Sequence, residues 1–187
     1  STPMHILGAL DKPTSGDYFL EGVDVKKLDD DQLSDITNNK LAFIFQSYNL
    51  LPRTTALKNV ETPMFYGNID NATRTKKAKK LLESVGLADR IYNLSKQLSG
   101  GQQQRVAIAR ALSMNPTILL ADEPTGNVST KQSNEIMTLF CQLNNQGHTI
   151  VMITHDPETA VVAKRIINLR DGQINQDYLN KSRRVNG

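Results

Sequence analysis

The sequence LSGGQQQRVAIARAL, residues 98–112, joins a short glycine-rich segment directly to a run of apolar residues at helical spacing. Two adjacent glycines allow backbone N–H groups to approach a ligand closely, and Ser99 adds a hydroxyl group beside them. The helix that follows directs the positive end of its dipole toward the same place. The segment therefore indicates an anion-binding turn, most simply for phosphate. Taken alone, it would be better explained as an ordinary glycine turn with a serine helix cap.

The next segment, ILLADEPT at residues 118–125, is an apolar strand that ends in two adjacent carboxylates. In folds that alternate strands and helices, ligands bind at the carboxyl edge of a parallel sheet. Successive side chains on a strand point to opposite faces, so Asp122 and Glu123 need not share one task. One carboxylate suits a Mg²⁺ ion held partly through water, and the other suits deprotonation of an attacking water. The alternative is that these acids merely face solvent, which is more common for one carboxylate than for two.

Two further polar residues follow apolar strands. His155 follows the predicted strand at residues 149–154, and Gln46 follows the predicted strand at residues 41–45, whose continuous apolar pattern is typical of burial on both faces. The histidine suits donation to a phosphate, and the glutamine suits a metal ligand or a sensor of a γ-phosphate. Each is weak evidence alone, because a single histidine is usually structural and glutamine is ordinary at a strand end.

The remaining segments follow the same alternation of strands and helices. Between residues 54 and 115 no strong strand pattern appears. We expect there a helical subdomain, inserted into an α/β core made of residues 1–53 and 116–187 within one domain. The other predicted elements are helices at residues 3–10, 28–38, 76–85, 102–112 and 130–145, a helix start at Asp156 and Pro157, and strands at residues 18–25, 117–121 and 165–169.

Composition limits the class of protein. The chain has 187 residues with 39% apolar and 22% charged, which allows one globular domain with a substantial core. No run approaches the roughly 18 to 20 apolar residues that span a bilayer, and no secretory signal is evident. The net charge of +3 is modest, so the basic clusters indicate solvated surface rather than a nucleic-acid site. The single cysteine, Cys141, excludes an internal disulfide, and its apolar surroundings predict a buried thiol.

In this order and spacing, the four motifs resemble the ABC ATPase family over essentially the whole chain. Residues 98–102 are similar to the family's signature motif, residues 118–123 to its Walker B motif, Gln46 to its Q-loop glutamine and His155 to its switch histidine. The surrounding sequence looks like the branch of macrolide exporters, lipoprotein-releasing ATPases and antimicrobial-peptide-resistance transporters. The resemblance implies a P-loop NTPase (RecA-like) α/β core with a mainly parallel sheet and an inserted α-helical signature subdomain.

The resemblance also gives a meaning to the first residues. In the family, a Gly-rich Walker A loop ends in Gly-Lys-Ser-Thr and continues into an apolar helix. Ser1 then matches the magnesium-ligating hydroxyl, and Thr2 is the residue beside it. The glycines, the lysine and the first strands of the fold would lie upstream. Because that loop makes most contacts to the phosphates, we expect a chain that starts at Ser1 to bind ATP weakly and to hydrolyse almost none.

As a whole, the resemblance implies an ATPase subunit that powers export or membrane extraction of peptides, drugs or lipoproteins. Glu123 would be the general base, His155 the γ-phosphate sensor, and Mg²⁺ would be held by Ser1, Gln46 and Asp122. The implied partners are a second ATPase subunit packed head-to-tail and a transmembrane permease, with the chain in the cytoplasm on the inner face of the membrane and without nucleic acid. The residues implied to bind ATP and its metal are Ser1, Thr2, Gln46, Ser99, Gly100, Gly101, Gln102 and Asp122.

Ser129 departs from the family, whose D-loop has Asp at this position to help form the partner subunit's site. A simpler interpretation of Ser129 is a helix N-cap. Other classes share some of these motifs but fit less well. A DNA-repair or chromosome-structure ATPase would carry a long heptad coiled coil, and a translation factor would carry two such domains. A non-catalytic regulatory subunit is disfavoured because Glu123 and His155 are both present.

Overall fold

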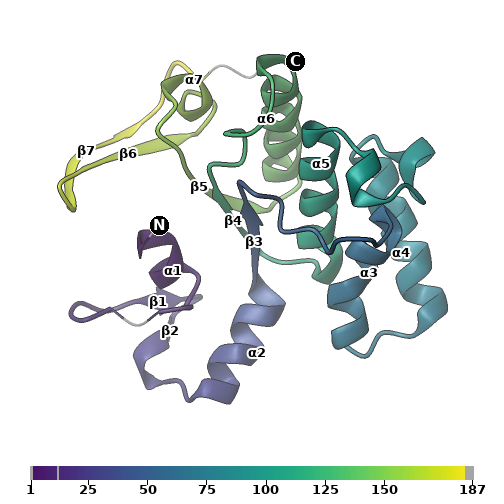
Figure 1. Ribbon diagram of the computed structural model, residues 1–187. Coiled ribbons are helices and arrows are strands. Elements are labelled where there is room, and N and C mark those ends of the chain that lie inside the picture. Colours follow the sequence, from purple (N-terminus) through teal and green to yellow (C-terminus); the bar gives the residue numbers. More distant parts are fainter. Residues whose placement is uncertain (1, 12, 184–187) are drawn as a thin grey trace.

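A parallel sheet lies at the centre of the computed structural model, which describes residues 2–11 and 13–183 (Figure 1). Its strands are β3 (Leu41–Phe45), β4 (Ile118–Asp122) and β5 (Thr149–Ile153), in the order β3-β4-β5. The register places Phe45, Asp122 and Ile153 side by side at the carboxyl edge. The predicted α/β fold with a parallel sheet is confirmed.

Helices connect these strands and cover one face of the sheet. Three of them, α3 (Ala56–Tyr66), α4 (Asn71–Ser84) and α5 (Gly100–Ala111), lie between β3 and β4 in the chain, and α6 (Thr130–Asn145) leads from β4 to β5. The helix α5 contacts α3, α4, α6 and β3, so it joins the helical segment to the sheet.

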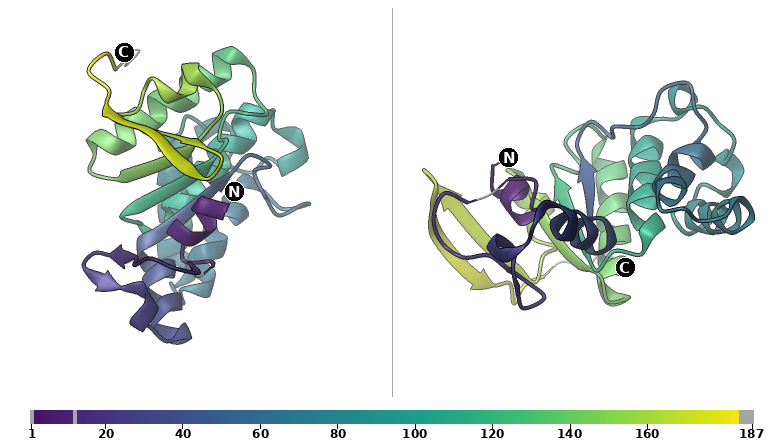
Figure 2. Two further views of the ribbon diagram at one scale, coloured as in Figure 1. Left: turned by 90° about the vertical axis from the view of Figure 1, so that its left-hand side faces the viewer. Right: turned by 90° about the horizontal axis from the view of Figure 1, so that it is seen from below.

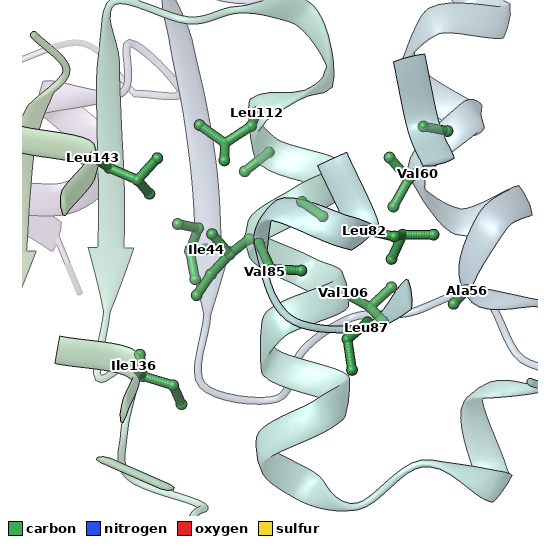
Figure 3. Packing of buried hydrophobic residues seen from close by; sticks show 14 of the residues in the cluster. Ile44, Ala56, Val60, Leu82, Val85, Leu87, Val106, Leu112, Ile136 and Leu143 are labelled. Carbon is green, nitrogen blue, oxygen red and sulfur yellow. The ribbon is translucent and has the colours of Figure 1, made fainter. Parts of the chain in front are cut away.

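One continuous apolar cluster holds this side together. Ile44 of β3 is buried with Val60 of α3, Leu82 of α4 and Val106 of α5 (Figure 3). Burial of such a side chain stabilises the fold by roughly 1.5–3 kcal/mol. Cys141 of α6 is buried, as predicted. None of the helices in the described part of the chain is long and apolar enough to span a bilayer.

The opposite face of the sheet is covered less completely. The first part of the chain forms α1 (Thr2–Leu7), a small antiparallel sheet of β1 (Phe19–Leu20) and β2 (Val23–Asp24), and α2 (Asp30–Lys40). This part meets the sheet at Gly8, where an added Cβ would overlap the ring of Phe43. Phe43 and Phe45 stack with ring centroids 5.7 Å apart and remain partly exposed. The prediction that β3 is buried on both faces is therefore wrong for these two side chains.

The last described segment forms α7 (Pro157–Ala160) and a hairpin of β6 (Arg165–Arg170) and β7 (Gln173–Leu179). Asp156 caps α7 by accepting hydrogen bonds from the N–H groups of Glu158 and Thr159, as the Asp-Pro pair predicts. The hairpin extends from the sheet on the side away from α3 and α4 (Figure 2). The strand β7 was not predicted from the sequence.

A buried carboxylate connects α3 to α4. Glu61 is 2% exposed and accepts hydrogen bonds from Lys58 Nζ at 2.7 Å and from Thr75 Oγ1 of α4 at 2.6 Å. Burial alone would raise the pKa of this carboxyl, but the two hydrogen bonds and the charges of Lys58 and Arg74 outweigh burial and lower it. A lowered pKa stabilises the fold above the ordinary glutamate pKa, and this contribution is lost as pH falls through the lowered value.

Glu61→Gln is therefore expected to reduce the free energy of unfolding by about 1 kcal/mol at neutral pH, because the negative charge beside Lys58 is lost and the amide has one oxygen for the two donors. The difference from the wild type should shrink as pH falls through the lowered pKa of Glu61 and its carboxyl becomes protonated. Urea unfolding followed by circular dichroism across this range measures it. Glu83→Gln, at an exposed position of α4, is the matched control and should change little. An equal loss at both ends of the pH range would contradict a contribution from the charge.

Candidate active site

The two predicted catalytic residues, Glu123 and His155, meet at the carboxyl edge of the sheet. Glu123 follows β4 in a left-handed conformation with φ of 45°, and its N–H donates to the Ile153 carbonyl of β5 at 2.9 Å. One carboxylate oxygen accepts from the backbone N–H of His155 at 2.9 Å and lies 2.7 Å from His155 Nδ1. The other oxygen accepts from Thr154 Oγ1 at 3.1 Å. Three groups that follow β5 therefore fix this carboxylate, on a residue whose left-handed backbone conformation is uncommon for residues other than glycine.

The histidine in this pair has a shifted pKa. The side chain of His155 is 85% exposed, whereas that of Glu123 is 20% exposed. The hydrogen bond to Glu123, and then the negative charge of that carboxylate, raise the pKa of His155 above its ordinary value. The imidazolium form therefore persists to higher pH, and in that form both ring nitrogens carry protons. His155 can then hold Glu123 with one N–H and offer the other to an anion.

Asp122 and Gln46 come to the same edge on neighbouring strands. Asp122 ends β4 in register with Phe45, the residue before Gln46. The Gln46 Nε2 donates to Asn127 Oδ1 at 3.5 Å, and Asn127 Nδ2 donates to the Gln46 carbonyl at 3.1 Å. Gly126 permits this contact, because a Cβ there would overlap the Gln46 amide. The loop after β4 thus orients the glutamine that follows β3.

The donor atoms at this edge fit Mg²⁺ better than a softer metal. Within the described residues, no group of three or more His, Cys, Asp and Glu side chains could hold a metal ion. The edge instead offers the carboxylate of Asp122 and the amide of Gln46, and Mg²⁺ takes such oxygen ligands together with waters and substrate phosphates. Ser1, the other predicted ligand, lies outside the described residues, as does the side chain of the predicted ATP-binding Thr2.

The glycine-rich segment is the first turn of a helix. The helix α5 starts at Gly100, two residues earlier than predicted, with Ser99 as its N-cap. Ser99 Oγ accepts from the N–H of Gln102 at 3.3 Å, and Gln102 Oε1 accepts from the N–H of Ser99 at 2.9 Å. This reciprocal pair is a capping box. It leaves the N-terminus of a 12-residue helix at an exposed serine, which is a favourable place for an anion.

The two glycines make room for side chains that the sequence analysis did not identify. A Cβ at Gly100 would lie 2.8 Å from Tyr48 Oη, and a Cβ at Gly101 would lie 2.7 Å from Gln132 Cδ of α6. Tyr48 also donates to the carbonyl of Asn127 at 3.0 Å. The glycines therefore allow Tyr48 and Gln132 to pack closely against the start of α5. The sequence predicted only that they allow a ligand to approach. For Gln132 a signal was present, since residues 129–132 repeat the Ser-x-x-Gln pattern of residues 99–102.

An arginine of α5 holds the loop that follows Gln46. Tyr48 and Asn49 adopt left-handed conformations, with φ of 60° and 47°. Arg110 donates to the carbonyl of Asn49 at 2.6 Å and to the carbonyl of Tyr48 at 2.9 Å. Burial lowers the pKa of Arg110, although a guanidinium stays protonated in proteins. Through Arg110, near its C-terminal end, the helix α5 thus stabilises the strained loop that follows Gln46.

Comparison with known proteins agrees with this arrangement of motifs. A family model described as ABC transporter matches residues 1–126. The chain belongs to the ABC transporter family. It is 52% identical over 174 residues to an uncharacterized ABC transporter ATP-binding protein of Thermotoga maritima, covering 93% of this chain and 74% of that protein. It is 49% identical over 177 residues to the macrolide export ATP-binding/permease protein MacB of Marinobacter nauticus, covering 95% of this chain and 28% of that protein.

Solved structures of ABC transporter cassettes have the same fold as this chain. A dimeric structure of MJ0796, a bacterial ABC transporter cassette, superposes with a TM-score of 0.86 at 44% identity, covering 97% of this chain and 80% of that one. The function predicted from sequence, an ATP-binding and ATP-hydrolysing subunit of an ABC transporter, is confirmed at the level of the family.

Proposed function

We propose that Glu123 is the general base for ATP hydrolysis at the carboxyl edge of the sheet. The observation that carries this is the fixed carboxylate, held by Thr154 at 3.1 Å and by His155 at 2.7 Å. Its oxygens lie where open parallel sheets bind nucleotides, and a carboxylate there can take the proton of an attacking water. His155 offers its second N–H to the transferred phosphate and stabilises the negative charge that develops on it.

We propose further that Asp122 and Gln46 hold Mg²⁺, with Ser1 as an additional ligand, and that Thr2 binds the phosphates beside it. Bound Mg²⁺ supplies positive charge to the β- and γ-phosphates. The contacts of this chain support the assignment, since Asn127 donates to the carbonyl of Gln46 at 3.1 Å and keeps that residue at the edge.

Ser99, Gly100, Gly101 and Gln102 are proposed to bind the phosphates of a nucleotide held by a second subunit. Ser99 bonds to Gln102 and to Gln132 of α6, whereas Glu123 bonds to the residues after β5. The chain therefore has two separate groups of phosphate-binding residues, the signature segment at residues 99–102 and the sheet edge with Glu123. In a head-to-tail dimer, each nucleotide would contact the sheet edge of one subunit and the signature segment of the other. The similar cassette MJ0796 is described as dimeric, which supports this arrangement.

We propose that a transmembrane permease is the partner that converts hydrolysis into transport. The Marinobacter relative is described as a macrolide export ATP-binding/permease protein, and this chain aligns to only 28% of it. By this likeness the chain works in the cytoplasm at the inner face of the membrane. It would drive export or membrane extraction of drugs, peptides or lipoproteins, with residues 54–115 as the subdomain that faces the permease.

ATP-driven dimerisation tests the proposed head-to-tail dimer. In the full-length protein carrying Glu123→Gln, which slows hydrolysis and lets the bound state accumulate, Mg²⁺-ATP should double the molar mass measured by light scattering after gel filtration. Adding Ser99→Glu should keep the protein monomeric, because the new carboxylate at position 99 would face the phosphates of the nucleotide and repel them. Removing Mg²⁺ with EDTA should also prevent the dimer.

The matched control is Ser84→Glu, the same change at an exposed position near the end of α4. It should dimerise as the parent does. If the Ser99→Glu protein dimerises equally well with Mg²⁺-ATP, the signature segment does not contact the nucleotide and the proposed dimer is wrong.

A further inference from the structure

Gln132 of α6 connects the N-termini of two helices. Its Oε1 accepts from the backbone N–H and from the hydroxyl of Ser129, both at 3.3 Å, which caps α6. Its Nε2 donates to Ser99 Oγ, the cap of α5, at 3.3 Å. The structure thus confirms Ser129 as an N-cap. It also shows that the capping glutamine of α6 reaches the serine of the signature segment.

The contact has a consequence for the hydrogen of the Ser99 hydroxyl. A hydroxyl has one donor proton and two acceptor lone pairs. Ser99 Oγ accepts from the N–H of Gln102 at 3.3 Å and from Gln132 Nε2 at 3.3 Å. With both lone pairs directed at N–H donors, the proton points away from the helix ends and is ready to be donated to an anion.

Gly101 is the residue that makes this contact possible. A Cβ at position 101 would lie 2.7 Å from Cδ, 2.8 Å from Nε2 and 2.9 Å from Cγ of Gln132. The amide of Gln132 therefore lies directly on the glycine, and any larger residue at 101 would displace it. Gly101 is buried, whereas Ser99 is exposed. The amide of Gln132 therefore packs against a buried glycine, while the Ser99 hydroxyl stays accessible.

We propose that Gln132 is a positioning residue that orients the Ser99 hydroxyl toward the phosphate of the nucleotide. This inference rests on the function proposed above for Ser99. Gln132 itself does not touch the nucleotide; it acts by occupying a lone pair of Ser99 and by fixing the N-terminus of α5 against that of α6.

The test is the KM for ATP of the intact transporter. Gln132→Met, which has a similar size but no amide, should raise KM by about fivefold, the effect of one lost hydrogen bond. The turnover number kcat should change by less than about twofold, because Ser99 binds substrate rather than taking the proton. In a protein that already carries Ser99→Ala, the same Gln132→Met change should have no further effect on KM.

A second variant separates positioning from helix capping. Gln132→Glu keeps an oxygen that accepts from Ser129, so α6 stays capped and the melting temperature should not fall. The carboxylate cannot donate to Ser99 and would instead draw the Ser99 proton back, so KM should rise at least as much. Gln142→Glu makes the same charge change at an exposed position of α6 and should leave KM unchanged.

The outcomes distinguish this inference from the function on which it rests. If Ser99→Ala leaves KM unchanged, Ser99 does not bind the nucleotide, and both proposals are wrong. If Ser99→Ala raises KM while Gln132→Met does not, only the positioning by Gln132 is wrong. If Gln132→Met raises KM equally with and without Ser99, Gln132 acts through another residue and the inference is again overturned.

Discussion

Glu123→Gln is expected to reduce ATP turnover of the intact transporter by about 10²- to 10⁴-fold, the usual contribution of a general base. The change is conservative in shape. The glutamine oxygen can still accept both hydrogen bonds from His155, and the Thr154 hydroxyl can rotate to accept from the new amide. The amide cannot take a proton from water, so chemistry is lost while the fold is kept. Steady-state ATPase measurements give kcat, and the melting temperature should stay within about 3 °C of the wild type.

The pair Glu123–His155 supplies an independent readout of the same variant. Because the carboxylate raises the pKa of His155, its replacement by a neutral amide should move the His155 titration, followed by NMR, toward lower pH. Glu158→Gln, an exposed carboxylate near the start of α7, is the matched control and should keep full turnover. If Glu123→Gln retained turnover within tenfold of the wild type, Glu123 would not be the base.

The convergence of the proposed catalytic residues could be predicted because it depends only on parallel pairing of the strands that precede them. Glu123 follows one apolar strand and His155 follows another, and parallel neighbours bring such residues to one edge. The pairing of β4 with β5 and the 2.7 Å contact between the two side chains bear this out. The same argument placed Gln46 at this edge, since β3 pairs with the other side of β4.

Contacts that depend on loop conformation could not be predicted in the same way. Tyr48 reaches Gly100 because the loop after Gln46 contains left-handed residues, which no composition pattern in this sequence signals. The helix α5 starts earlier than predicted because the Ser-x-x-Gln capping box of Ser99 and Gln102 outweighs the poor helix propensity of the two glycines. The helix α3 was not predicted individually, and it contains Pro63, a residue that usually ends a helical pattern.

The division into a core and an inserted subdomain at residues 54–115 stays a prediction. The helix α5 lies within that range, yet Val106 and Ile108 of α5 share one buried cluster with Leu119 of the sheet. A subdomain boundary that is drawn only from where helices and strands occur therefore cuts through one continuous hydrophobic core. The loop at residues 46–55 contacts the segment before Ser99 through a bridge between Thr55 and Leu94 and through the side chains of Ser95 and Asn59.

Asn59→Ala is expected to lower the free energy of unfolding by about 3 kcal/mol, the largest loss of stability that we expect for a polar residue here. Asn59 is fully buried on α3 and its Oδ1 accepts from the N–H of Leu51 at 2.7 Å. Its Nδ2 donates to Thr54 Oγ1 at 2.9 Å, to the Thr55 carbonyl at 3.0 Å and, more weakly, to Ser95 Oγ at 3.4 Å. Alanine would take the acceptor from the N–H of Leu51 and the donors from Thr54 and Thr55, and would leave a gap at a fully buried position.

For a chain of this size the loss corresponds to a fall in melting temperature of about 6 to 12 °C, measurable by calorimetry. Asn59→Asp should lose at least as much at neutral pH, because it keeps the oxygen for Leu51 but places a charge where Thr54 and Thr55 offer acceptors. Part of that loss should return in acid as the carboxyl is protonated and regains a donor. Asn134→Ala, at an exposed position of α6, is the control and should change stability by less than about 0.5 kcal/mol. Equal effects at the two positions would show that the buried amide contributes no more to stability than an exposed one, which would contradict the prediction.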